Sequence, residues 1–134
     1  MARSASEHPT ELELMILKVL WESSPLPVRE IRDRLVVLGR DVAHTTVITA
    51  LNIMLRKKYV SRSPQKNSYL FSPRVTRDQV GSGFVGDVVH RIFDGSVKDV
   101  MLAVLETRDL NEADLQEIRR LIAQKSKTLR GDQP

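Results

Sequence analysis

Residues 43–58 (AHTTVITALNIMLRKK) carry two contrasting faces at helical spacing, and this pattern restricts the fold more than any other stretch. Apolar side chains recur every three or four residues, as in one stripe of an α-helix: Val47, Ala50, Leu51, Met54 and Leu55. The opposite face holds small or hydrogen-bonding groups and then a cation: Thr45, Thr49, Asn52 and Arg56. Short polar or methyl-bearing groups suit base edges, and cations suit phosphates. The pattern predicts a DNA-recognition helix.

The charge around this helix is one-sided. No Asp or Glu occurs between Asp41 and Asp78, whereas residues 56–66 within this stretch supply five cations: Arg56, Lys57, Lys58, Arg62 and Lys66. Residues 1–73 hold 11 Lys and Arg against 7 Asp and Glu, while residues 74–134 hold 10 of each. A modest basic excess alone often has no function. Its confinement to the half with the Thr-rich helix favours a polyanion as partner.

Two helices precede the recognition helix. Thr10 and Glu13 form the T-x-x-E pattern of a capping box, and the helix that they open ends at residues 23–25 (SSP). A second, shorter helix follows Pro27, and Gly39 is suited to end it.

Beyond residue 58 the apolar spacing changes to that of strands. Residues 59–63 and 68–72 are typical of two β-strands, with residues 64–67 (PQKN) as their turn. Three helices followed by a β-hairpin predict a winged helix-turn-helix domain over residues 1–73.

Residues 74–134 are typical of three further helices, so the chain is predicted to be mainly α. The first covers residues 76–93, and Ser96 and Asn111 cap the other two. About 60 residues in three separate helices rarely bury enough surface to be stable alone. We therefore expect a homodimerisation domain whose interface is formed by apolar stripes: Val80, Phe84, Val88, Ile92, Val97, Val100, Met101, Val104, Leu105, Leu115, Ile118, Leu121 and Ile122.

The first of these helices contains Gly81, Gly83 and Gly86, each of which costs about 1 kcal/mol relative to Ala. Two interpretations stay open. The helix is broken or bent near Gly83, or the small residues allow close approach of another helix or a joint between the two halves.

Several function classes are excluded. The chain has no cysteine, which removes disulfides, thiol catalysis and thiolate metal sites. The Gly-rich segment GSGFVG follows no strand and therefore lacks the context of a nucleotide-binding loop. We expect no enzymatic activity, cofactor or metal. No apolar run approaches the roughly 18 residues that span a bilayer, and the N-terminus lacks a signal peptide, so a cytoplasmic location is expected.

Four segments carry a family resemblance: TELELMILKVLW, DVAHTTVITALNIML, YLFSP and RIFDGS. With these in this order, the chain resembles the penicillinase repressor (BlaI/MecI) family of bacterial transcription factors from Thr10 to about Ser126. The resemblance implies an operator-binding winged helix followed by a helical dimerisation domain. It also implies repression of antibiotic-response genes, as in many members, which a membrane sensor-protease system relieves by cutting the repressor.

The sequence departs from the family pattern at several positions. Ile48 and Ile53 stand where polar or Arg residues are common on the recognition helix, and Lys58 stands where Gly usually follows it. Residues 101–104 (MLAV) lack the Asn-Phe pair of some cleavage sites, so no cut is assigned. Without cysteine, the chain cannot sense copper as cysteine-bearing relatives do.

We predict that the DNA-binding residues are His44, Thr45, Thr46, Ile48, Thr49, Asn52, Arg56, Lys57, Arg62 and Lys66. The threonines and Ile48 would contact thymine methyl groups, and the cations would contact phosphates. A homodimer would bind a palindromic double-stranded operator. The structural alternatives are solvated threonines and cations, an idle His44, and an Ile48 buried against a neighbouring helix.

Two rival functions keep the winged helix. In the first, it binds another protein, although an acid-rich face would then be expected. In the second, it binds DNA in an architectural role without repression, and the sequence does not separate this role from repression.

Overall fold

The computed structural model describes residues 8–107 and 109–131 of the 134-residue chain. It is mainly helical and forms two compact units, which divide between Asp87 and Val88, inside helix α4 (Arg77–Arg91). The predicted domain boundary between residues 73 and 74 lies in front of this helix, and the domain assignment stays a prediction.

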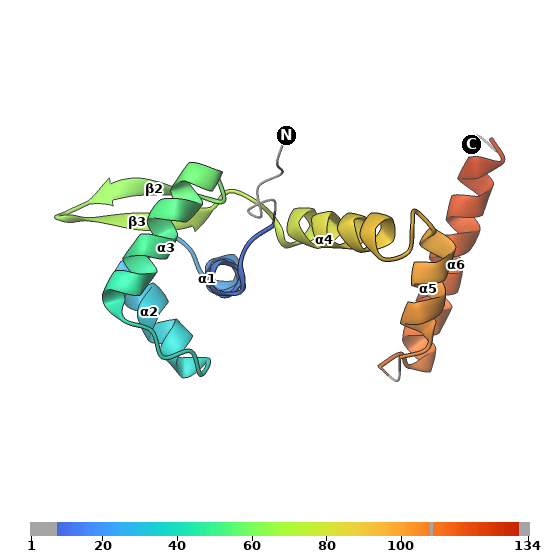
Figure 1. Cartoon of the computed structure of the whole chain (residues 1–134), viewed down its shortest axis with the longest axis horizontal. Helices are drawn as coiled ribbons and strands as arrows, with labels where there is room; N and C mark the ends of the chain where they lie inside the picture. Colours follow the sequence, from blue (N-terminus) through green and yellow to red (C-terminus); the bar gives the residue numbers. More distant parts are fainter. Residues whose placement is uncertain (1–7, 108, 132–134) are drawn as a thin grey trace. The chain divides into compact units, whose positions relative to one another are not determined.

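The N-terminal unit is a winged helix, as predicted. Three helices precede a hairpin, and α3 lies beside the hairpin in Figure 1. The elements are α1 (Glu11–Glu22), β1 (Leu26–Pro27), α2 (Val28–Val37), α3 (His44–Lys57), β2 (Val60–Gln65) and β3 (Ser68–Pro73).

The predicted capping box of α1 is confirmed. The Glu13 amide donates to Thr10 Oγ1 over 3.2 Å, and the Thr10 amide donates to Glu13 Oε1 over 2.9 Å. These two bonds satisfy amides that the first turn of any helix leaves without an intrahelical acceptor.

The apolar stripes of the three helices meet in one core with the sheet. Its fully buried members are aliphatic or Met side chains: Ile16, Leu17, Leu20, Ile31, Leu35, Val47, Leu51, Met54 and Val60. Burial of a side chain of this size contributes about 1.5–3 kcal/mol. The core therefore fixes the buried side of α3 and, with it, the side that stays exposed.

The sheet differs from the prediction in two respects. Strand β1 was not predicted, because its two residues are too short to show alternation, yet Leu26 pairs with Phe71 of β3. The predicted turn over residues 64–67 was too long, since Pro64 pairs with Tyr69 within the β2–β3 ladder. Pro64 is tolerated there because β2 is an edge strand of the β1-β3-β2 sheet.

Helix α4 is continuous, so a break near Gly83 is not observed. Thr76 caps the helix: its hydroxyl accepts from the Gln79 amide over 3.0 Å. Outside the helix itself, no described atom lies within 4 Å of the place that a Cβ on Gly81 or Gly86 would occupy. The close helix approach that these glycines would permit is therefore not made within the described chain.

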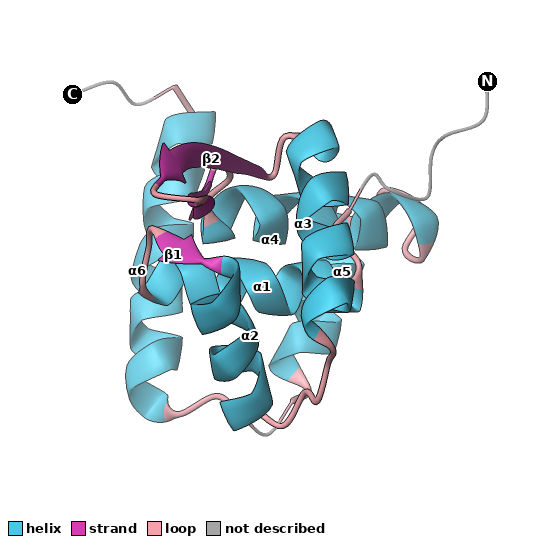
Figure 2. Ribbon diagram, turned by 90° about the vertical axis from the view of Figure 1, so that its left-hand side faces the viewer, coloured by secondary structure: helices cyan, strands magenta, loops and turns pink. Residues whose placement is uncertain are grey.

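The two C-terminal helices leave their apolar side chains exposed or half-exposed. Helices α5 (Val97–Leu105) and α6 (Glu112–Leu129) overlap in Figure 1 but are separated in Figure 2, and neither contains a buried side chain. The predicted caps are confirmed: Ser96 Oγ accepts from the Asp99 amide, and Asn111 Oδ1 accepts from the Asp114 amide. None of the described helices is long and apolar enough to cross a bilayer.

Candidate nucleic-acid interface

Helix α3 presents one continuous exposed face. Because Val47, Leu51 and Met54 are fully buried, the helical period turns the other side outward. Seven of the predicted DNA-binding residues lie on this exposed side: His44, Thr45, Thr46, Ile48, Thr49, Asn52 and Arg56. The structure thus brings together the helical part of the predicted site.

A groove runs between α3 and the hairpin and has a volume of about 660 Å³. From α3 it is lined by His44, Ile48 and Asn52, and from the hairpin by Arg62 and Lys66. Ile48 is 37% exposed in this groove, so its alternative placement, buried against a neighbouring helix, is not observed. The predicted helix and hairpin residues therefore share one concave surface.

The threonines line the other flank of α3. Thr45, Thr46 and Thr49 border a shallower hollow together with Ile53 and the start of α1. Ile53 is half-buried, in contrast to Ile48. The exposed face of α3 therefore has an apolar and amide-bearing edge toward the hairpin and a hydroxyl-bearing edge toward α1.

Several lining residues of the groove were missed by the sequence analysis, and two of them, Tyr69 and Arg29, bear on its cations. The Arg62 guanidinium carbon lies 4.1 Å from the centre of the Tyr69 ring, a cation–π contact between β2 and β3. Arg29 from α2 adds a further cation to the lining. Strand alternation could have indicated Tyr69, because it shares a face with the buried Phe71; Arg29 carries no comparable signal.

Lys57 is placed apart from the other predicted cations. Its ammonium lies 3.0 Å from both carboxylate oxygens of Glu13, a residue only 3% exposed. Burial and, secondarily, the Glu13 charge raise the pKa of the neighbouring Tyr59 phenol. Because Glu13 is 44 residues away in sequence, the spacing within α3 gave no indication of this partner. The structure therefore gives Lys57 an internal role and does not bring it together with Arg56.

Three helices around an aliphatic core, an exposed third helix and a basic hairpin define a winged-helix protein. The family model described as penicillinase repressor matches residues 9–124. The chain belongs to the penicillinase repressor family of DNA-binding transcriptional repressors, which are regulators and not enzymes.

The chain is similar to individual regulators along most of its length. It is 28% identical over 116 residues to the transcriptional regulator BlaI of Mycobacterium tuberculosis, covering 85% of this chain and 82% of that protein. It is 19% identical over 112 residues to the penicillinase repressor of Staphylococcus aureus, covering 84% and 88%. The solved complex structure of hsRosR-S4 aligns with a TM-score of 0.48 at 17% identity, covering 90% and 91%.

Proposed function

We propose that this protein represses transcription by binding a palindromic operator as a homodimer. The observation that carries the proposal is the exposed face of α3, which has no acid and borders a groove with cations on its hairpin side. The major groove of B-DNA admits one α-helix, and cations beside that helix meet the phosphates.

Base edges would be contacted from the middle of the exposed face. Thr45 and Thr49 offer methyl and hydroxyl groups, Ile48 offers only apolar contact, and Asn52 can bond to adenine. Thymine methyl groups suit Ile48 and the threonines, so thymine-rich half-sites are expected. All three threonines border the hollow toward α1, but the helical period puts Thr46 farthest from Asn52 around the helix, so Thr46 would contact the rim of the site.

The phosphates would be met by exposed cations of α3 and the hairpin and by a ring N–H of His44. Arg56 ends the exposed face of α3, Arg62 and Lys66 lie on the hairpin, and His44 stands in the first turn of α3. Lys57 is left out of this interface because Glu13 already binds its ammonium.

A second copy of the chain would cover the C-terminal helices. The exposed members of the predicted interface are Phe84, Ile92, Val97, Met101, Val104, Leu105, Leu121 and Ile122, and the half-exposed ones are Val88, Val100, Leu115 and Ile118. Val80 is left out because it packs against the N-terminal core. A two-fold dimer presents two α3 helices, which explains a palindromic target.

Our inferences about the target genes and about the relief of repression rest on the family alone. We infer that the operators control antibiotic-response genes, that a sensor-linked protease ends repression, and that the protein acts in the cytoplasm, where the chromosomal DNA lies. The name of the Staphylococcus aureus relative supports the first inference, and no cleavage position is assigned.

Selection of bound sequences from a random duplex pool tests the proposal. We expect an inverted repeat, and a plot of log K against log salt with a clearly negative slope. Thr49→Ala should weaken the selected duplex more than random DNA, with Lys98→Ala on α5 as the control that changes neither. Enrichment of no sequence would favour an architectural role, and a slope near zero would favour a protein-binding module.

A further inference from the structure

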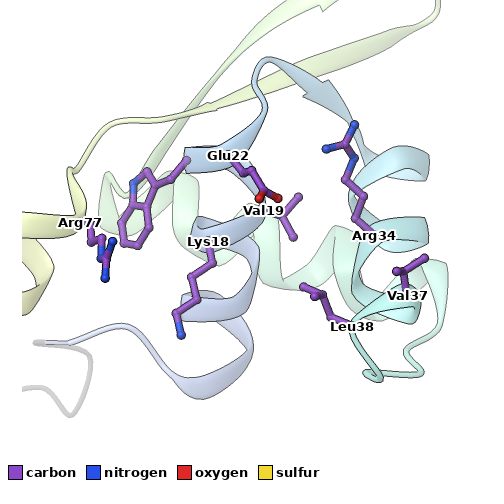
Figure 3. Close-up of a pocket in the computed structure, with 8 residues that line it drawn as sticks. Lys18, Val19, Glu22, Arg34, Val37, Leu38 and Arg77 are labelled. Carbon is purple, nitrogen blue, oxygen red and sulfur yellow. The ribbon is translucent and has the colours of Figure 1, made fainter. Parts of the chain in front are cut away.

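A second concave surface of the N-terminal unit lies away from the groove beside α3. It is formed by α1, the end of α2 and the first turn of α4, and has a volume of about 640 Å³ (Figure 3). This volume falls within the roughly 300–1,000 Å³ of small-molecule sites. It shares no lining residue with the groove that borders α3, so the proposed DNA contacts do not account for it.

Its floor is apolar in a way that the fold does not require. Val37 is 85% exposed and Leu38 is 59% exposed, although the buried stripe of α2 is complete with Ile31 and Leu35. The indole of Trp21 is also part of the lining of this surface. Exposed aliphatic side chains and an aromatic ring in the lining of one hollow are typical of a binding surface.

The indole is held in a fixed position. Trp21 Nε1 donates to the Val75 carbonyl oxygen over 2.8 Å, across 54 residues of sequence. This bond satisfies the polar edge of the ring and leaves its apolar body in the lining of the pocket.

Three cations surround this floor, one from each helix. Figure 3 shows Lys18 of α1, Arg34 of α2 and Arg77 of α4 at the pocket, with Glu22 as the one acid in the lining. Within residues 8–107 and 109–131, none of the three cations has a hydrogen-bonding or ion-pair partner. By contrast, other cations of the chain, such as Lys57, bind acids of their own.

We propose that this pocket binds a small aryl carboxylate: a planar apolar ring that carries one anionic group. The ring would lie against apolar side chains of the lining, and the carboxylate would meet one of its guanidinium groups, which offers paired N–H donors. Because the cations outnumber the single Glu22 carboxylate, the pocket favours an anionic ligand. Its apolar side chains favour a ligand with a ring over an inorganic ion.

The single tryptophan of the chain makes the test specific. In an amide-correlation NMR spectrum of the full-length protein labelled with ¹⁵N, the indole N–H gives one signal, which belongs to Trp21. Titration with 1-naphthoate should shift this signal saturably, with half-saturation below about 10 mM. The neutral 1-naphthalenemethanol should bind at least about fivefold more weakly, and inorganic phosphate should leave the signal in place.

Variants separate the pocket from general surface binding. Arg34→Ala and Arg77→Ala should each weaken naphthoate binding about threefold to fivefold, whereas Lys98→Ala, on α5, should not. Val37→Glu adds a negative charge at an exposed position that the core does not use, and should abolish binding. Equal binding of the neutral analogue, or unchanged binding by Arg34→Ala and Val37→Glu, would overturn the proposal. A retained operator affinity in these variants shows that the winged helix is folded.

Discussion

The two ends of this chain use the same sequence pattern with opposite outcomes. Helices α1 to α3 bury their apolar stripes in one core, whereas α5 and α6 carry comparable stripes and bury nothing. A stripe at helical spacing therefore predicts a helix and identifies its apolar side, but it does not identify what covers that side. In the N-terminal unit the same chain supplies the cover, while in the C-terminal helices we propose that a second copy does.

This contrast matters because a helix without tertiary packing is only marginally stable in water. Exposed apolar side chains from α5 and α6 would leave both helices in that state in a lone chain. Four sets of variants test whether the two ends of the chain differ in this way.

The largest effect is expected from a charge in the proposed dimer interface. Val104→Glu combined with Leu105→Glu should yield a monomer in sedimentation velocity, because two carboxylates would have to be desolvated at the interface. Operator affinity should then fall about 100-fold or more, since the second half-site no longer adds to the first. Lys98→Glu puts the same charge elsewhere on α5 and should leave the dimer intact. A double variant that stays dimeric would refute this interface.

Two substitutions to alanine compare a helix packed within its own chain with a helix that we expect to pack against a second copy. Leu51→Ala, in the N-terminal core, should lower the free energy of unfolding by about 2–5 kcal/mol at any protein concentration. Leu105→Ala should cost less, and its cost should depend on protein concentration because its cover comes from another molecule. Urea unfolding at two concentrations measures both, and a concentration-independent loss at Leu105 would contradict the comparison.

The Glu13–Lys57 pair separates stability from DNA binding within the first unit. Lys57→Met leaves a buried carboxylate without its cation and should cost about 1–3 kcal/mol of unfolding free energy. Arg56→Met, one residue earlier and exposed, should change stability by less than about 0.5 kcal/mol but weaken operator binding. If Lys57→Met instead weakens operator binding without a loss of stability, Lys57 does not have the internal role that we assign to it.

Removal of a helix cap should have the smallest effect. Asn111→Ala deletes the acceptor of the Asp114 amide and should cost about 1 kcal/mol. This loss registers in thermal unfolding followed by circular dichroism only if α6 is folded together with the rest. Thr10→Ala removes one hydrogen bond of the capping box of α1 and serves as the control in the N-terminal unit. If Thr10→Ala lowers the melting temperature and Asn111→Ala does not, α6 unfolds separately from the rest.

Much of the fold could be predicted, because most of it depends on local pattern. The caps at Thr10, Ser96 and Asn111 were found where expected, as were the helices and the hairpin. Strand β1 was missed because two residues show no period, and the hairpin turn was too long in the prediction because Pro64 suggested a turn rather than an edge strand.

The candidate site was predictable along α3 and much less so across elements. Spacing within one helix assigns Ile48 and Asn52 to one face without any knowledge of tertiary contacts. No spacing relates Tyr69 to Arg62 through their ring contact, or Lys57 to Glu13 across 44 residues. Such contacts depend on which surfaces meet, and this is decided only after the elements pack.

Local pattern in the amino-acid sequence was enough to assign the helices and the hairpin, to identify the apolar side of each helix, and to locate the basic excess in the half with the Thr-rich helix. Only folding pairs Glu13 with Lys57, places Ile48 in one groove with the hairpin, and brings Lys18, Arg34 and Arg77 into the lining of one pocket with Trp21. These two kinds of feature differ in their range along the chain. Backbone hydrogen bonding and apolar period act over a few residues, whereas charge pairs and pockets depend on groups that are far apart in sequence.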